Sequence, residues 1–160
     1  FFGGNDYKDA IWIIPSVASS LYFNFVFQIF ANVEFYFMKN KYITYASVSG
    51  AVLNIILNWF GIRLWGYIIA GYTTLLCYIL FAISHCLFVK KVAKENIGGK
   101  KLFNTSAVFL IGIILVILGQ LMLLVYEHVV ARYFILFILV CVIVLKHKKI
   151  IKIMGEMRKR

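Results

Sequence analysis

Long uncharged runs are the feature that most constrains how this chain can fold. Four stretches without Asp, Glu, Lys or Arg each exceed the roughly 18–20 residues that a helix needs to cross about 30 Å of hydrocarbon. They are Ala10–Val33, Tyr42–Ile62, Leu64–Val89 and Leu102–Tyr126, with a weaker fifth at Tyr133–Leu145. Hydrophobic residues form 63% of the chain and charged residues 14%, against about 45–50% and 25% in soluble domains. The sequence predicts an all-α polytopic membrane protein with about five transmembrane helices.

The expected helices set out an alternating path through the membrane. We place them at Ala10–Met38, Tyr42–Phe60, Trp65–Val89, Asn104–Tyr126 and Val129–Leu145, followed by a basic tail to Arg160. Fourteen Lys and Arg residues then fall on the side that holds the tail, and three fall on the other side. Because basic loops stay in the cytoplasm, we expect a multi-pass protein of the cell (plasma or inner) membrane with a cytoplasmic C-terminus.

Neither the net charge nor the cysteines indicate a catalytic, metal or nucleic-acid site. A net charge of +11 is compatible with nucleic-acid binding, but the basic residues sit at the ends of spans, so we expect membrane lipids and no nucleic acid as partners. Cys77, Cys86 and Cys141 lie inside apolar spans without metal-ligand spacing. The sequence therefore predicts no catalytic residues, no metal and no cofactor.

Helix one holds the most informative polar pattern. Its polar residues recur every fourth position, so each is displaced about 40° from the last and together they form a slowly winding stripe. They are Ser16, Ser20, Asn24, Gln28 and Asn32. An amide near the bilayer centre is costly against lipid. The stripe therefore either forms interhelical hydrogen bonds or lines a water-filled cavity, and we favour the cavity.

Glu34 is the only acidic residue within a predicted span. Its place about 15 Å from Asn24 along the helix is close to the hydrocarbon boundary. Two readings are open: an interfacial residue with Lys39 or Lys41 near by, or an ion-coupling residue, which is the usual meaning of an intramembrane acid.

Helices two and three carry further candidates. One face of helix two holds Thr44, Ser47, Ala51, Asn54 and Asn58, which suits close packing or an extension of the cavity. On helix three, Thr74 and His85 share a face. His85 is either a hydrogen-bonded packing residue or a group that titrates or contacts phosphate. Helix four, with Gly112 and Gly119 seven apart, is predicted to be a packing helix.

Three segments resemble a known family of transporters. Phe-Phe-Gly-Gly-Asn-Asp-Tyr at 1–7 is similar to a short outer loop F-G-x-x-Y that precedes a span starting near Ile-Ile-Pro. Leu-Asn-Ile-Ile-Leu-Asn at 53–58 resembles N-x-x-L-N, and residues 65–78 resemble G-x-x-A-A-x-x-T-x-x-S-Y. Ile69 replaces the usual Ala, and the short connection Gly61–Leu64 lacks the usual Ile-Pro. In their order, these segments resemble the oligosaccharide and polysaccharide flippases of the multidrug/oligosaccharidyl-lipid/polysaccharide exporter superfamily.

The resemblance implies an architecture and a function. Members have twelve to fourteen helices in two lobes, so the chain is expected to be the C-terminal part of a longer protein. Residues 1–91 would be the last three helices of the C-terminal lobe, 92–103 a cytoplasmic loop, 104–147 an additional helix pair and 148–160 the basic tail. The implied substrate is a polyprenyl-pyrophosphate-linked oligosaccharide repeat unit, moved to the outer leaflet for surface polysaccharide synthesis beside other polysaccharide-assembly proteins.

Two other classes of function are weighed against the flippase. Another exporter of the superfamily, for drugs or lipid precursors, is the near alternative; a cation exporter is expected to need cavity acids, and only Glu34 is available. A membrane enzyme of polysaccharide assembly needs clustered acids, His or Arg at the membrane edge, and the sequence holds no such motif. We therefore expect a transporter and not an enzyme.

Overall fold

The structure, a computed structural model, describes residues 10–126, 128, 130, 133–138, 140, 141 and 144–146. It contains four long helices: α1 (Ile14–Tyr36), α2 (Asn40–Trp65), α3 (Ile69–Ile97) and α4 (Thr105–Tyr126). Each is long and apolar enough to cross a membrane, and the described residues include no strand. The chain is an all-α polytopic membrane protein, as its uncharged runs predict.

The last part of the chain is described only in pieces. Contacts divide the chain into two compact units, residues 1–121 and 122–160, and each is considered by itself. The expected fifth helix, Val129–Leu145, lies partly outside the described residues; those of its residues that are described are helical. The segment Phe1–Tyr7 and the tail 148–160 lie outside the described residues.

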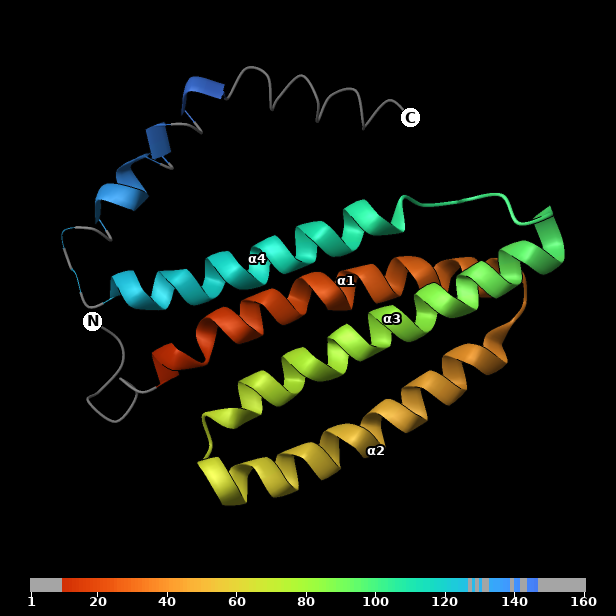
Figure 1. The fold of residues 1–160 in the computed structure, drawn as a ribbon, viewed down its shortest axis with the longest axis horizontal. Coiled ribbons are helices and arrows are strands. Elements are labelled where there is room, and N and C mark those ends of the chain that lie inside the picture. The colour runs from red at the N-terminus through yellow and green to blue at the C-terminus, as the bar shows by residue number, and fades with distance from the viewer. Residues whose placement is uncertain are drawn as a thin grey trace. The chain divides into compact units, whose positions relative to one another are not determined.

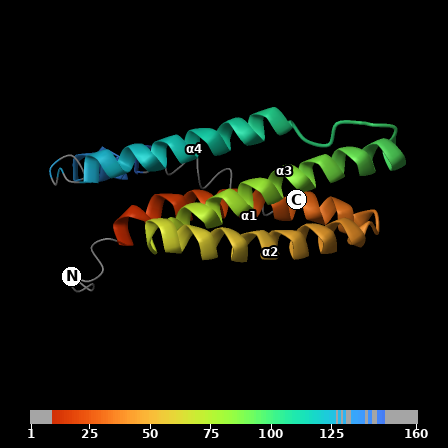
Figure 2. The same ribbon diagram turned by 60° about the horizontal axis from the view of Figure 1, so that its bottom comes forward.

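Helices α1 and α3 form the centre of the first unit. They lie side by side in both views, with α2 along α3 and α4 along α1 (Figures 1 and 2). Successive helices are joined by short connections, so neighbours in the sequence run in opposite directions. As a result, α3 contacts both α1 and α2, and it has the largest buried share of the four.

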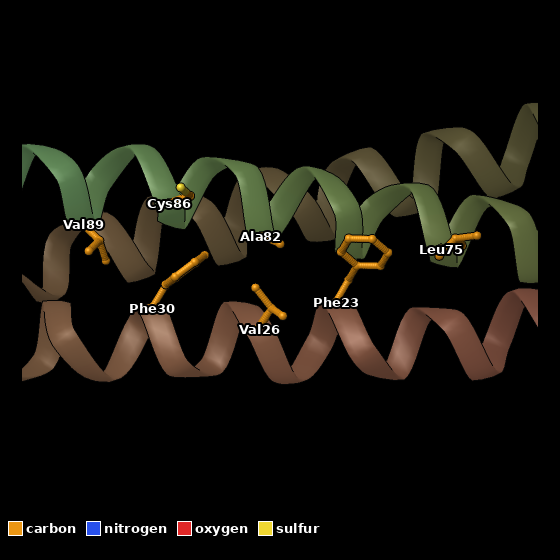
Figure 3. Packing of buried hydrophobic residues seen from close by; sticks show 7 residues of the cluster. All are labelled: Phe23, Val26, Phe30, Leu75, Ala82, Cys86 and Val89. Atoms are coloured by element: carbon orange, nitrogen blue, oxygen red, sulfur yellow. The ribbon is translucent and has the colours of Figure 1, made fainter. Parts of the chain in front are cut away.

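The core is a single apolar seam between α1 and α3. Phe23, Val26 and Phe30 project from α1 at spacings of three and four residues, which places them on one helical face. They interleave with side chains of α3, among them Ala82 and Cys86 (Figure 3). Ala82 is fully buried, and its small side chain leaves room for the large rings of α1.

Helix α2 ends later than the sequence predicts. We expected a connection at Gly61–Leu64, but the helix continues through these residues to Trp65, and the chain turns at Gly66. Gly66 has a φ of +78°, a conformation that glycine adopts without steric cost. Gly61 remains helical and buried because its bare face lies against Ile69 of α3.

Helix α3 also runs beyond its expected end at Val89, reaching Ile97. The added turns carry Lys90, Lys91 and Lys94, which are good helix formers. Charge stops a segment from entering the hydrocarbon but does not break helical hydrogen bonding, so the uncharged run ends before the helix does. Gly98 ends the helix in the left-handed conformation, and the Gly99 N–H donates to the Ala93 carbonyl.

The expected packing role of α4 agrees with its contacts. Gly112 is buried, and a Cβ there would lie 2.6 Å from Cζ of Phe23. Gly119, two turns later, lies against Pro15 and Ser19 of α1. The hydroxyl of Tyr22 donates a hydrogen bond of 2.8 Å to the Val108 carbonyl. The two glycines thus bring α4 against the same side of α1.

Candidate functional site

The polar stripe of α1 is divided between the interior and the surface. Ser16 and Ser20 are buried, Asn24 is half-buried, and Gln28 and Asn32 are exposed. The division follows from the four-residue spacing. Each step rotates the stripe about 40° around the helix, so it passes from the buried face to the exposed face that also carries Leu21 and Phe25.

The three amides of this stripe, Asn24, Gln28 and Asn32, form the amide face of α1. Gln28 Nε2 donates a hydrogen bond of 3.0 Å to Asn24 Oδ1, so two of the three amides are linked to each other. This bond uses one donor and one acceptor, and the side chains of Gln28 and Asn32 are exposed on the described helices. Since Asn24 lies near the middle of α1, the amide face is at hydrocarbon depth, where contact with lipid alone is unfavourable.

Glu34 and His85 form a buried pair between α1 and α3. The distance from His85 Nδ1 to Glu34 Oε1 is 2.8 Å, and both residues have 0% relative exposure. Glu34 belongs to the face of α1 that carries Phe23, Val26 and Phe30, because it follows Phe30 by four residues. The antiparallel path of α3 brings His85 opposite this face.

The side chains of the expected basic neighbours do not pair with the Glu34 carboxylate. Lys39 instead bonds to Glu95 of α3, with 3.1 Å between Nζ and Oε2. Lys41 lies over the Tyr42 ring, 5.5 Å from its centroid. The Glu34 side chain points into the bundle, whereas Lys39 and Lys41 lie in and after the turn that follows α1. Their side chains therefore do not meet the Glu34 carboxylate.

Aromatic rings enclose the Glu34–His85 pair. The ring of Phe27 lies 5.4 Å from the His85 ring, and the ring of Phe88 meets it edge-on at 6.1 Å. One atom of each partner, Glu34 Oε2 and His85 Nε2, is buried without a hydrogen bond. Buried polar atoms are rarely left in this state, so this pair differs from an ordinary structural contact.

The amides of α2 join a separate cluster with α3. Asn58 Nδ2 donates to Asn54 Oδ1 at 3.0 Å, and the Thr73 hydroxyl donates to Asn58 Oδ1 at 2.8 Å. Asn54 Nδ2 also lies 3.5 Å from Cys77 Sγ. These contacts hold the two helices together and use the amides within the bundle. The other members of the predicted face, Thr44, Ser47 and Ala51, are exposed.

Thr74 does not join either cluster. Its hydroxyl donates to the Ala70 carbonyl one turn back on the same helix, at 2.8 Å. Threonine in a helix commonly makes this local bond. Thr74 shares a face of α3 with His85, about three turns later, but its hydroxyl bond is local and does not reach the Glu34–His85 pair.

A further polar cluster near the start of α1 was not predicted from the sequence. Gln120 Nε2 of α4 donates to Ser16 Oγ at 3.3 Å, and the Tyr72 hydroxyl of α3 lies 3.5 Å from Gln120 Oε1. Gln120 is the single amide in α4, and that isolation was the available signal. The cluster links three helices and explains why Ser16 is buried.

A basic cavity lies at the end of the bundle where α3 connects to α4. Its volume is about 770 Å³, and its apolar wall includes Phe30, Cys86 and Val89. Lys90, Lys100 and Lys101 also line it, so the rim is positively charged. The sequence placed these lysines in a loop but gave no indication of a cavity beneath them.

Comparison with known proteins adds no relative to these observations. No protein-family model, curated protein or solved structure matches the chain.

Proposed function

We propose that the chain is the C-terminal part of an exporter that moves a polyprenyl-pyrophosphate-linked oligosaccharide to the outer leaflet of the cell membrane. The observation that carries the proposal is the amide face of α1. Gln28 and Asn32 are exposed and Asn24 is half-buried, all on a helix long and apolar enough to cross a membrane. Such a face needs water, a polar substrate or further polar helices against it.

The chemistry of the amide face suits a sugar chain. Amide groups both donate and accept hydrogen bonds, and a sugar offers many hydroxyls that do the same. Transporters place substrate contacts near the bilayer midplane, at the interface between moving halves. The resemblance of residues 1–91 to the flippases supplies the substrate class, and no contact within the bundle does so.

The basic tail and the loop 92–103 fit the same proposal. Fourteen basic residues fall on the side that holds them, which favours the cytoplasm. The substrate would then enter from the cytoplasmic leaflet. Because binding and release need no covalent step, the proposal includes no catalytic residue and no cofactor.

A complementation experiment tests the proposal. The whole gene is deleted in the source organism and replaced by the wild type or by a Gln28→Leu, Asn32→Leu double variant. The wild type should restore surface polysaccharide. The double variant should not, and it should accumulate the lipid-linked oligosaccharide on the inner leaflet. Leucine is favourable at lipid-exposed positions of a membrane helix, so the amount of protein in the membrane should be unchanged.

Phe25→Leu provides the matched control, because Phe25 lies on the same exposed face, one turn away, and carries no polar group. It should complement fully. If the deletion leaves surface polysaccharide normal and no lipid-linked oligosaccharide accumulates, the flippase proposal is wrong. If the double variant complements as well as Phe25→Leu does, the amide face has no part in transport.

A further inference from the structure

We propose that Glu34 and His85 form a proton-binding site within the interface between α1 and α3. The site rests on the geometry of the pair, and its use in transport rests on the function proposed above. The ligand is a single proton, held by two side chains whose nearest atoms are 2.8 Å apart. Neither side chain is exposed.

The balance of charge favours one dissociable proton on the pair. A lone carboxylate in an apolar interior is strongly unfavourable. One proton makes the pair neutral overall, either as imidazolium beside carboxylate or as neutral imidazole beside carboxylic acid. In the first form Nδ1–H donates to Oε1, and in the second the acid O–H donates to Nδ1. The proton can therefore move between the partners while the hydrogen bond remains.

The unpaired atoms show what loss of the proton would require. In both neutral forms His85 Nε2 carries a hydrogen, yet neither this atom nor Glu34 Oε2 has a hydrogen-bond partner. Loss of the proton from Nε2 turns an unpaired donor into an unpaired acceptor and leaves one negative charge among the rings of Phe27 and Phe88. The neutral forms are therefore favoured while the interface is dry, and loss of the proton requires water to reach the pair.

Few other charged or titratable groups surround the pair. They are Lys39 after α1, Lys41 and Tyr42 on α2, and Tyr78, Cys86 and Lys90 on α3; α4 carries no charged residue. Lys39 is engaged with Glu95, and Tyr42 stacks on Phe88 at 4.8 Å between ring centroids. Among the described residues, His85 is the charged or titratable side chain that bonds to the Glu34 carboxylate.

The basic cavity provides a route for the proton. Phe30 and Cys86 line it; Phe30 precedes Glu34 by one helical turn, and Cys86 follows His85 directly. Water in the cavity would lie about one turn from the pair. Deprotonation places a charge between α1 and α3, which favours hydration and separation of the two helices at this end. Proton occupancy would in this way control the packing of the two central helices.

The test reads the protonation of His85 directly. The full chain is labelled with ¹⁵N-histidine and reconstituted in nanodiscs, with His128 and His147 replaced by glutamine so that His85 alone reports. Nitrogen and proton NMR spectra are recorded between about pH 5 and pH 9, a range that spans ordinary histidine titration. The wild-type pair should give a strongly deshielded Nδ1 proton. In Glu34→Gln that signal should vanish, because an amide cannot share a proton with the imidazole.

Glu95→Gln is the matched control, because it removes a carboxylate from an exposed ion pair on the same helix. It should leave the His85 spectrum unchanged. If Glu34→Gln gives the wild-type spectrum, the proposal is overturned. If that variant does not fold, the wild-type sample decides: a His85 that lacks the deshielded Nδ1 proton also overturns it.

A transport measurement separates the two proposals. If the spectra are as expected and the deletion strain nevertheless exports its oligosaccharide, the proton site stands and the flippase proposal fails. If export depends on the gene and His85 lacks the deshielded Nδ1 proton, the flippase proposal stands and the proton site fails.

Discussion

At the scale of single residues, the two best-defined polar clusters inside the bundle differ in what they can do. The Asn54–Asn58–Thr73 cluster is neutral, and its members bond to one another across α2 and α3. The Glu34–His85 pair can gain or lose a proton, and it keeps two unsatisfied atoms. The first cluster is suited to holding helices together, and the second is suited to a change of state.

The hydrogen bond from Thr73 to Asn58 should contribute measurably to stability. Asn58→Leu, Thr73→Val and the double variant form a mutant cycle, evaluated from unfolding in detergent. Interhelical hydrogen bonds in membranes contribute about 0.6 kcal/mol on average and at most about 1.7 kcal/mol. The coupling energy between Asn58 and Thr73 should therefore be positive and no larger than about 1.7 kcal/mol.

Thr44→Val is the control for this cycle. Thr44 bonds only to the Asn40 carbonyl of its own helix, so its replacement should show no coupling to Asn58. A coupling energy of zero between Asn58 and Thr73 would contradict a stabilising role for their contact.

At the scale of elements, close packing depends on a few glycines whose surroundings differ. In α4, a Cβ on Gly112 would meet the ring of Phe23 at 2.6 Å. That ring is 3% exposed and part of the core, so it has little room to move. A Cβ on Gly119 would meet its nearest atom, Ser19 Oγ, at 3.3 Å. The same helix therefore offers a tight site and a looser one.

Replacing each glycine by alanine should separate the two effects. Gly112→Ala should lower the free energy of unfolding by roughly 1–3 kcal/mol, the usual cost of overpacking. Gly119→Ala should change it much less, because alanine also favours the helix by up to about 1 kcal/mol. Thermal unfolding of both variants in the same detergent gives the comparison. Equal stability of the two would show that α4 does not pack against Phe23 as described.

At the scale of the whole molecule, the outer helices present apolar surfaces that nothing described covers. Only 11% of the spanning window is buried in α2 and in α4, and large side chains such as Trp59 and Leu110 are exposed. Lipid or further helices of a longer protein suit these surfaces. The amide face of α1 does not suit lipid, and so it is the surface most in need of a polar partner.

Topology is the property of the whole molecule most open to a direct test. We expect Lys94 to lie in the cytoplasm and Arg63 outside. The three cysteines are replaced, and Lys94→Cys or Arg63→Cys is exposed to an impermeant thiol reagent in intact cells. Arg63→Cys should react at once and Lys94→Cys only after lysis. Rapid labelling of Lys94→Cys in intact cells would show that the proposed orientation is wrong.

The place of the four described helices was predictable from the sequence, but their ends were less so. Uncharged length decides whether a segment can cross a membrane, and all four complete runs are helices. The ends depend on local backbone chemistry: Gly66 turns the chain where Gly61 does not, because Gly61 is packed against Ile69. The same amino acid has different effects at two places, and only its neighbours in space distinguish them.

The candidate residues divide in the same way. The spacing of Ser16, Ser20, Asn24, Gln28 and Asn32 determined a winding stripe by helical geometry alone. Which end of it is buried depended on where α3 and α4 pack. Glu34 and His85 were each recognisable as unusual in a span, but they are 51 positions apart. Periodicity describes one helix at a time; the pairing of these residues was decided by the antiparallel register of α1 and α3, which depends on packing between helices.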